Sequence, residues 1–208
     1  MFTIYGRTNS STVRKVLWLC AELGLDGYER LDYGRGFAPC DTPEYRKLNP
    51  NMLVPTLVDG DLVVWESNAI LRYLAAKYGG DEIYPAGLAN RAIVEQWLEW
   101  QTTTSNIGIR DLFFALILKR PAYMDHDVQA KSLVLASEAM RLLDAQLAAT
   151  GAFVTGGALT IADCALGMFV HRWFVLPIER QEFSALAAYY ERLKDRAPFQ
   201  EWIIGQGV

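Results

Sequence analysis

The feature that most constrains the fold is a change of hydrophobic periodicity near residue 80. Before it, short runs rich in β-branched and aromatic residues alternate with segments whose apolar residues recur at helical spacing. From residue 87 to residue 204, helical spacing continues almost everywhere and no convincing strand appears. The sequence therefore predicts a mixed α/β domain over residues 1–80, a linker near residues 79–86, and an all-helical domain over residues 87–208.

Local signals divide both parts into elements. The dipeptide Asp59-Gly60 joins two apolar runs and suits the tight turn of a β-hairpin. The first part is expected to contain a strand over 2–5, a helix over 12–25, a strand over 28–33, a helix over 42–51, a hairpin over 55–65 and a helix over 66–79. The second part is expected to contain helices over 87–118, 126–149, 160–173 and 184–195.

Composition excludes several classes of protein. The chain has 208 residues, of which 51% are hydrophobic and 21% charged, as in soluble globular proteins. The net charge of −4 comes without a basic stripe for nucleic acid, and no apolar run reaches the length of a membrane span. Three widely spaced cysteines without a CxxC argue against a disulfide framework and against a zinc site. With no signal peptide visible, a cytoplasmic location is expected.

The stretch 49–74 contains two unusual junctions. Pro55 directly precedes an apolar strand, where a proline cannot donate a ladder hydrogen bond. A cis Val54-Pro55 bond would leave the backbone N–H and C=O of Val54 free for another partner, although only about 5–6% of such bonds are cis and an ordinary trans loop is the alternative. Ser67 is expected to be the N-cap of the next helix, where free N–H groups attract a carboxylate. An N-cap serine also needs no ligand.

Three hydroxyls lie together in the loop after the first strand. Ser10, Ser11 and Thr12 are followed by Arg14, and Thr12 is expected to be the N-cap of the helix that begins there. From these residues alone, the loop is either a polar helix cap or a site where one hydroxyl takes part in chemistry.

These features together resemble a glutathione transferase. The resemblance rests on "VPT" before the third strand, "ESNAIL" at the third helix and "LTIADCALG" over residues 159–167, and it covers essentially the whole chain. It implies a thioredoxin-like α/β domain followed by an all-helical domain, with Thr160 and Asp163 forming the structural capping box. It also implies a cytoplasmic homodimer that uses glutathione as co-substrate in detoxification, with no metal, no nucleic acid and no membrane partner.

The resemblance also assigns roles to individual residues. The backbone at Val54 and Pro55 is expected to pair with the cysteinyl part of glutathione. Ser67 and its N–H are expected to bind the γ-glutamyl carboxylate, with Glu66 near the amino group. Many relatives have a polar or charged residue before "VP" for the glycine carboxylate, whereas this chain has the uncharged pair Met52 and Leu53. Arg35 or Arg110 is therefore expected to take that carboxylate, or it is held weakly.

The thiol of glutathione needs one strong hydrogen bond rather than a general base. Its pKa is near ~8.5 by analogy with cysteine, so a dominant thiolate at pH 7 needs a shift worth about 2.7 kcal/mol. A charge-assisted hydrogen bond supplies about 1.5–3 kcal/mol. In serine-type relatives the catalytic serine lies four residues before an arginine. Arg14 therefore favours Ser10 first, Ser11 second and Thr12 third.

A hydrophobic electrophile is expected between the two domains, against the helix over 87–118. Its candidate pocket residues are Ile107, Arg110, Phe113, Phe114 and, from the later helix, Trp173. For the aromatic residues the alternative is ordinary core packing. Arg110 needs an anionic partner, either near Asp111 or in a ligand. The competing functions are glutathione-dependent isomerisation, dehalogenation or peroxide reduction, and a non-catalytic binding module with the same fold.

Overall fold

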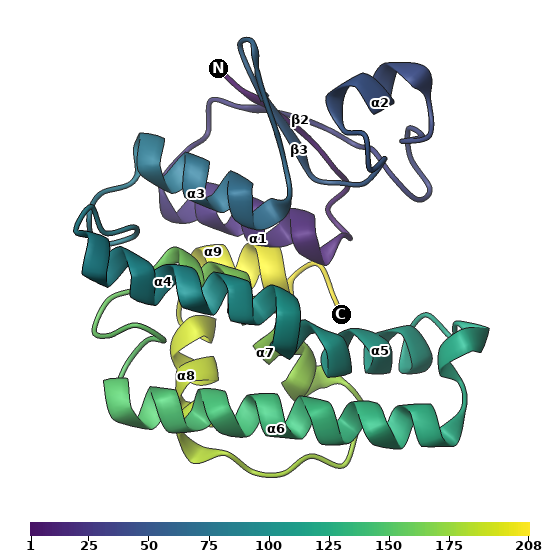
Figure 1. Ribbon diagram of the computed structural model, residues 1–208, viewed down its shortest axis with the longest axis vertical. Helices are drawn as coiled ribbons and strands as arrows, with labels where there is room; N and C mark the ends of the chain where they lie inside the picture. The colour runs from purple at the N-terminus through teal and green to yellow at the C-terminus, as the bar shows by residue number, and fades with distance from the viewer.

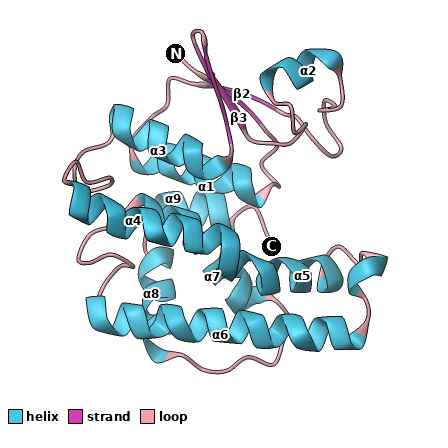
Figure 2. Ribbon diagram, in the orientation of Figure 1, coloured by secondary structure: helices cyan, strands magenta, loops and turns pink.

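A computed structural model describes all residues from 1 to 208, and its N-terminal part is built on a four-stranded mixed sheet (Figure 1 and Figure 2). Its strands are β1 (Thr3–Tyr5), β2 (Glu29–Leu31), β3 (Thr56–Asp59) and β4 (Leu62–Trp65), in the order β2-β1-β3-β4. β1 pairs parallel with β2 and antiparallel with β3. The register places Ile4 opposite Leu57, and both side chains are fully buried.

Three helices complete this part of the chain. They are α1 (Ser11–Glu22), α2 (Pro43–Leu48) and α3 (Ser67–Tyr78). In Figure 1, α1 and α3 lie side by side below the sheet, whereas α2 lies on the other side of the strands. The predicted order of strands and helices is confirmed.

Two predicted helix starts are wrong by one or two residues. Thr12 is not the N-cap of α1, because its hydroxyl donates to the Val54 carbonyl across the loop and Ser10 precedes the first helical residue. Ser67 is not the N-cap of α3 but its first residue. The N-cap is Glu66, whose φ of 69° turns the chain sharply as it leaves β4.

The rest of the chain is helical, as predicted. It comprises α4 (Leu88–Trp100), η1 (Gln101–Ser105), α5 (Asn106–Leu116), η2 (Pro121–Tyr123), α6 (His126–Thr150), α7 (Ile161–Val175), α8 (Ser184–Lys194), α9 (Ala197–Phe199) and η3 (Gln200–Ile204). The continuous helix expected over 87–118 is wrong in one respect, because η1 is a π-helical turn between α4 and α5. None of these helices has the length and apolar content to cross a membrane.

Helix α7 forms the centre of the molecule and joins its two parts. All its residues from Ile161 to Trp173 are buried, so it is enclosed on every side. Helix α1 packs directly against it at Gly167, where an added Cβ would lie 2.6 Å from the Trp18 ring. The Trp18 ring in turn packs edge-on against Phe199, with 4.9 Å between centroids. The sheet and the helical part therefore share one hydrophobic core.

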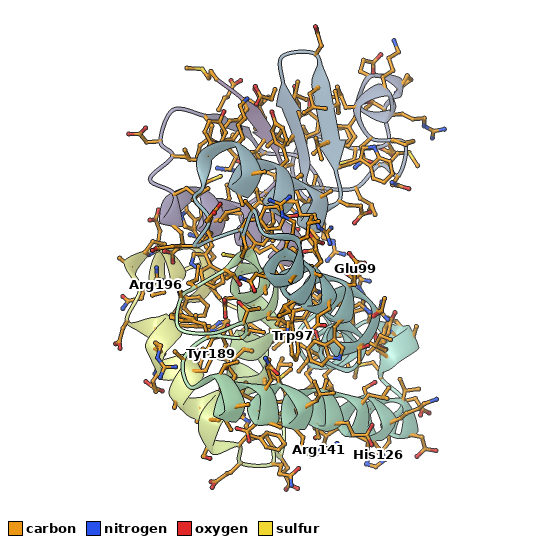
Figure 3. All side chains as sticks on the ribbon, turned by 60° about the vertical axis from the view of Figure 1, so that its left-hand side comes forward. Trp97, Glu99, His126, Arg141, Tyr189 and Arg196 are labelled. Atoms are coloured by element: carbon orange, nitrogen blue, oxygen red, sulfur yellow. The ribbon has the colours of Figure 1, made fainter.

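The predicted capping box is present at the start of α7. The Asp163 carboxylate accepts hydrogen bonds from Thr160 N–H at 2.8 Å, Val154 N–H at 3.0 Å and the Tyr189 hydroxyl at 2.9 Å. Figure 3 shows Tyr189 in the interior of the helical part. Burial raises the pKa of Asp163, and these hydrogen bonds oppose that shift. The carboxylate thus joins α7, α8 and the preceding loop.

A second buried polar network crosses the interface between the two parts. Lys15 Nζ on α1 donates to Asn68 Oδ1 on α3 at 2.6 Å and to Gln101 Oε1 in η1 at 3.2 Å. No carboxylate lies within ion-pair distance of this lysine. Burial lowers the pKa of Lys15 to about 7.

Replacing Asp163 with alanine is expected to lower the free energy of unfolding by about 3 kcal/mol or more, because four donors lose their acceptor: the N–H and hydroxyl of Thr160, the Val154 N–H and the Tyr189 hydroxyl. Urea denaturation measures the change. Asp127→Ala is the matched control, since this aspartate also lies in the first turn of a helix but is exposed to solvent. Equal losses in the two variants would contradict the structural role of Asp163.

The free energy of unfolding is expected to rise between pH 7 and pH 9. Lys15 has a pKa of about 7 in the folded chain and an ordinary value of 10.5 when unfolded, so the unfolded state binds more protons in this range. Lys15 alone contributes at most about 1.4 kcal/mol per pH unit. In Lys15→Met the rise should be smaller. Identical slopes in the two proteins would show that Lys15 does not titrate in this range.

Candidate active site

The hydroxyl-rich loop and the Val54-Pro55 loop meet through one side chain. Thr12 Oγ1 donates to the carbonyl oxygen of Val54 at 3.1 Å, and Ser10 Oγ lies 3.1 Å from Thr12 Oγ1. The single hydroxyl hydrogen of Thr12 is committed to Val54, so Ser10 must be the donor to Thr12. Through Thr12, Ser10 is connected to the Val54-Pro55 loop, although Val54 lies 42 residues after Thr12 in the sequence.

The two serines differ in their surroundings. Ser10 is buried and precedes α1, but its side chain does not cap the helix. Ser11 is partly exposed, and its hydroxyl bonds no other group of the protein. The N–H groups of Ser11 and Thr12 also have no acceptor in the protein, so the start of α1 favours an anion.

The Val54-Pro55 bond is cis, as considered from the sequence. Val54 N–H donates to no protein acceptor, and its carbonyl accepts only from Thr12. The neighbouring carbonyl of Leu53 is occupied by the Tyr45 hydroxyl at 2.8 Å and by Asn49 Nδ2 at 2.9 Å. Val54 is thus the residue in this loop whose N–H and C=O remain open to an extended peptide.

The Glu66–Ser67 turn lies at the same end of the sheet. Antiparallel pairing of Thr56 with Trp65 places it beside Pro55. The N–H groups of Ser67, Asn68 and Ala69 have no protein acceptor, and no side chain caps α3. Ser67 is buried, whereas Glu66 is exposed and pairs with no basic group. This turn can therefore bind a carboxylate and place an acidic group next to it.

Arg7 is a candidate that the sequence reasoning missed. Its Nε and Nη1 are buried and have no hydrogen-bond partner. A Cβ added at Gly34 would lie 3.6 Å from both Arg7 Nε and a Val54 methyl group, so the three residues lie close together. Burial and the nearby charge of Arg35 lower its pKa. Arg35 itself is exposed. The position of Arg7, directly after the first strand and before the hydroxyl-rich loop, is the sequence signal that could have identified it.

The loop before the cis bond offers no charge of its own. Leu53 is largely exposed and Met52 partly so, and the only polar contact of the Met52 side chain is with Arg46, at 3.1 Å between Nη2 and Sδ. A positive charge for an anion beside Val54 therefore has to come from another segment of the chain.

The candidate pocket residues on α5 are split between its surface and its core. Ile107 is exposed, and Arg110 pairs with Asp111 at 2.8 Å, which was the first of the two partners considered for it. Phe113 is buried beneath the guanidinium of Arg172, 3.7 Å from its ring centre. Phe114 is partly buried and packs edge-on against Tyr123 at 5.1 Å.

Trp173 does not face a cleft. It is 1% exposed and its ring packs against Phe183, with 6.1 Å between centroids. The expectation that it contacts a co-substrate is therefore corrected. Helix α7 is buried on all sides, so its aromatic residues fill the core.

The histidines and Cys20 lie outside the proposed site. His171 is buried and bonds the Tyr190 hydroxyl at 2.8 Å, and burial lowers its pKa to about 4. His126 is exposed on the outer surface of α6 (Figure 3). Cys20 is buried in the core, where burial raises its pKa to about 12. No group of three or more potential metal ligands is arranged to hold an ion.

Comparison with known proteins places this geometry in a family. Residues 1–76 match the N-terminal domain of glutathione S-transferases, and residues 127–192 match the C-terminal domain. The chain is 35% identical over 198 residues to glutathione S-transferase GstB of Escherichia coli K12, covering 94% of each protein. It is also 33% identical over 154 residues to glutathione S-transferase D7 of Anopheles gambiae, covering 74% of this chain and 68% of that protein.

A solved structure gives the same result. The theta class glutathione S-transferase from Xanthomonas axonopodis pv. citri, with glutathione bound, superposes with a TM-score of 0.89 and 44% identity over 98% of this chain and 97% of that one. Matches of this extent, on a fold with this arrangement of open backbone groups, show that the chain belongs to the glutathione S-transferase family.

Proposed function

We propose that this transferase binds glutathione at the edge formed by the two loops, stabilises its thiolate with the Ser10 hydroxyl, and directs it to a hydrophobic electrophile. The observation that carries the proposal is the set of unpaired donors at that edge, the N–H of Val54 and the first N–H groups of α3, together with the Ser10 hydroxyl, which is bonded only to Thr12. The Xanthomonas relative described with glutathione bound supports the same ligand here.

Each part of glutathione has a proposed partner. The cysteinyl backbone pairs antiparallel with the N–H and C=O of Val54, in the extended geometry beside Pro55. The γ-glutamyl carboxylate binds the N–H and hydroxyl of Ser67, and its ammonium lies near Glu66. We propose that Arg35 takes the glycine carboxylate together with Arg7, whose buried donors have no other partner.

The Ser10 hydroxyl can stabilise the thiolate at small cost. When the sulfur binds, the Ser10 hydrogen turns from Thr12 to the sulfur, while Thr12 keeps its bond to Val54. This charge-assisted bond supplies about 1.5–3 kcal/mol, and the start of α1 adds about 0.3–1 kcal/mol. Together they account for the shift of about 2.7 kcal/mol that a dominant thiolate at pH 7 requires.

The chemistry then follows from the thiolate. Its lone pair forms a bond to the electrophilic atom, and the leaving group, where there is one, departs with the electron pair of the broken bond. We propose that the electrophile binds along α5, near Ile107, Arg110 and Phe114, the three candidates there that are not buried. In this proposal residues 1–80 form the glutathione domain and residues 87–208 the co-substrate domain of a cytoplasmic homodimer.

Glutathione at millimolar concentration is expected to raise the melting temperature. A ligand at 100 times its Kd adds about 2.7 kcal/mol to the free energy of unfolding. Ser67→Ala should weaken binding about tenfold, because the carboxylate loses one hydrogen bond. Ser137→Ala, a serine on α6, is the matched control and should bind normally. An unchanged melting temperature of the native protein with glutathione would overturn the proposed function.

Ser10→Ala is expected to raise the pKa of bound glutathione by about 1–2 units, since the thiolate loses its hydrogen bond. A pH titration of the thiolate absorbance measures this shift. Turnover at pH 7 should fall about 10–100-fold while the Kd for glutathione changes little. Ser11→Ala is the control and should behave like the native protein. The reverse result, with the thiolate lost in Ser11→Ala, would reassign the role to Ser11.

A further inference from the structure

Lys15 is a buried cation that the proposed mechanism does not use. It is 3% exposed and lies on α1, five residues after Ser10. Its two hydrogen-bond acceptors, Asn68 Oδ1 and Gln101 Oε1, are both neutral amide oxygens. A buried ammonium is costly unless a negative charge compensates it. The structure thus contains a positive charge whose counter-ion is not supplied by a direct ion pair.

The π-helical turn η1 fixes the orientation of Asn68. The Leu98 carbonyl, just before this turn, accepts from Asn68 Nδ2 at 2.9 Å. Asn68 Nδ2 also lies 3.1 Å from Thr102 Oγ1 and 3.2 Å from Gln101 Oε1. With its amide nitrogen held in this way, Asn68 directs its oxygen to Lys15. These hydrogen bonds therefore determine which end of the Asn68 amide is the oxygen and which is the nitrogen.

Asn68 connects the lysine to the proposed carboxylate site. It directly follows Ser67, and its own backbone N–H is one of the three free donors at the start of α3. The residue that accepts from Lys15 therefore also supplies one of the donors for the carboxylate. The charge of Lys15 also interacts electrostatically with Glu66, the N-cap of α3.

The titratable groups that face Lys15 do not neutralise it. Arg72 on α3 has the same sign and is paired with Glu95 and Glu99 on α4. Cys164 on α7 is kept a neutral thiol, because burial raises its pKa. The charge of Glu66 raises the pKa of Lys15, but Glu66 is exposed and forms no ion pair with it. A carboxylate bound to the free N–H groups of α3 would add a second negative charge beside Glu66.

We propose that Lys15 is a positioning residue for glutathione: through Asn68 its ammonium orients the first turn of α3, and its charge is compensated by the γ-glutamyl carboxylate bound there. The inference rests on the proposed function, because that carboxylate belongs to glutathione bound at Ser67. In this proposal, the polar contacts between α1, α3 and η1 influence the affinity for glutathione.

The inference predicts a pH dependence of binding. In the free protein, burial lowers the pKa of Lys15 to about 7, and a bound anion raises it again. Binding above pH 7 therefore requires uptake of a proton, and affinity falls as the pH rises. His171 does not contribute to this dependence, because burial lowers its pKa to about 4 and it stays neutral.

Isothermal titration calorimetry with S-methylglutathione tests the inference, because this ligand has no thiol to titrate. From pH 6 to pH 8.5 the native protein is expected to bind about tenfold more weakly, with proton uptake visible as a dependence on buffer ionisation enthalpy. Lys15→Met should bind about tenfold more weakly at pH 6 and show little further change. Lys77→Met, an exposed lysine on α3, is the matched control and should follow the native profile.

The native profile can overturn the inference even if Lys15→Met does not fold. Binding with a flat pH profile and no proton uptake would overturn the inference while leaving the proposed function intact. A pH dependence that persists unchanged in a folded Lys15→Met would overturn it as well. Absence of binding at every pH would overturn the proposed function and this inference together.

Discussion

The hydrogen bond from Thr12 to the Val54 carbonyl is the interaction on which the arrangement of the site depends. It joins the start of α1 to a loop that is distant in sequence, with 3.1 Å between Oγ1 and the carbonyl oxygen. It also leaves Ser10 with a hydroxyl hydrogen that a stronger acceptor can take. In the proposed mechanism the donors are thus already in place, and a bound thiolate has only to redirect one of them.

The helical part of the chain holds this arrangement in position through its packing against α1. Helix α1 packs on α7 at Gly167, and the Asp163 carboxylate fixes the start of α7 by accepting four hydrogen bonds from the preceding loop and from α8. Lys15 connects the same α1 to α3 and η1. The position of the Ser10 hydroxyl thus depends on packing and polar contacts contributed by residues far beyond the sheet.

Sequence reasoning succeeded where short patterns carry local physics. The order of elements follows from hydrophobic periodicity and turn preferences, whereas the cis bond before Pro55 is only one of two alternatives and the capping box at Thr160 is implied by the resemblance. It failed where contacts between residues distant in sequence determine the position of a side chain. The Thr12 hydroxyl bonds the Val54 carbonyl instead of capping α1. Trp173 lies on α7, whose residues from Ile161 to Trp173 are all buried in the core. The unpaired donors of Arg7 appear only once its neighbours are known.

A structure of the protein with glutathione bound tests the central claim most directly. The account predicts that the sulfur lies about 3 Å from Ser10 Oγ and that Val54 N–H donates to the cysteinyl carbonyl. It also predicts that Thr12 keeps its bond to the Val54 carbonyl. A sulfur bonded to Ser11 instead, or a glutathione bound away from Val54, would contradict the account.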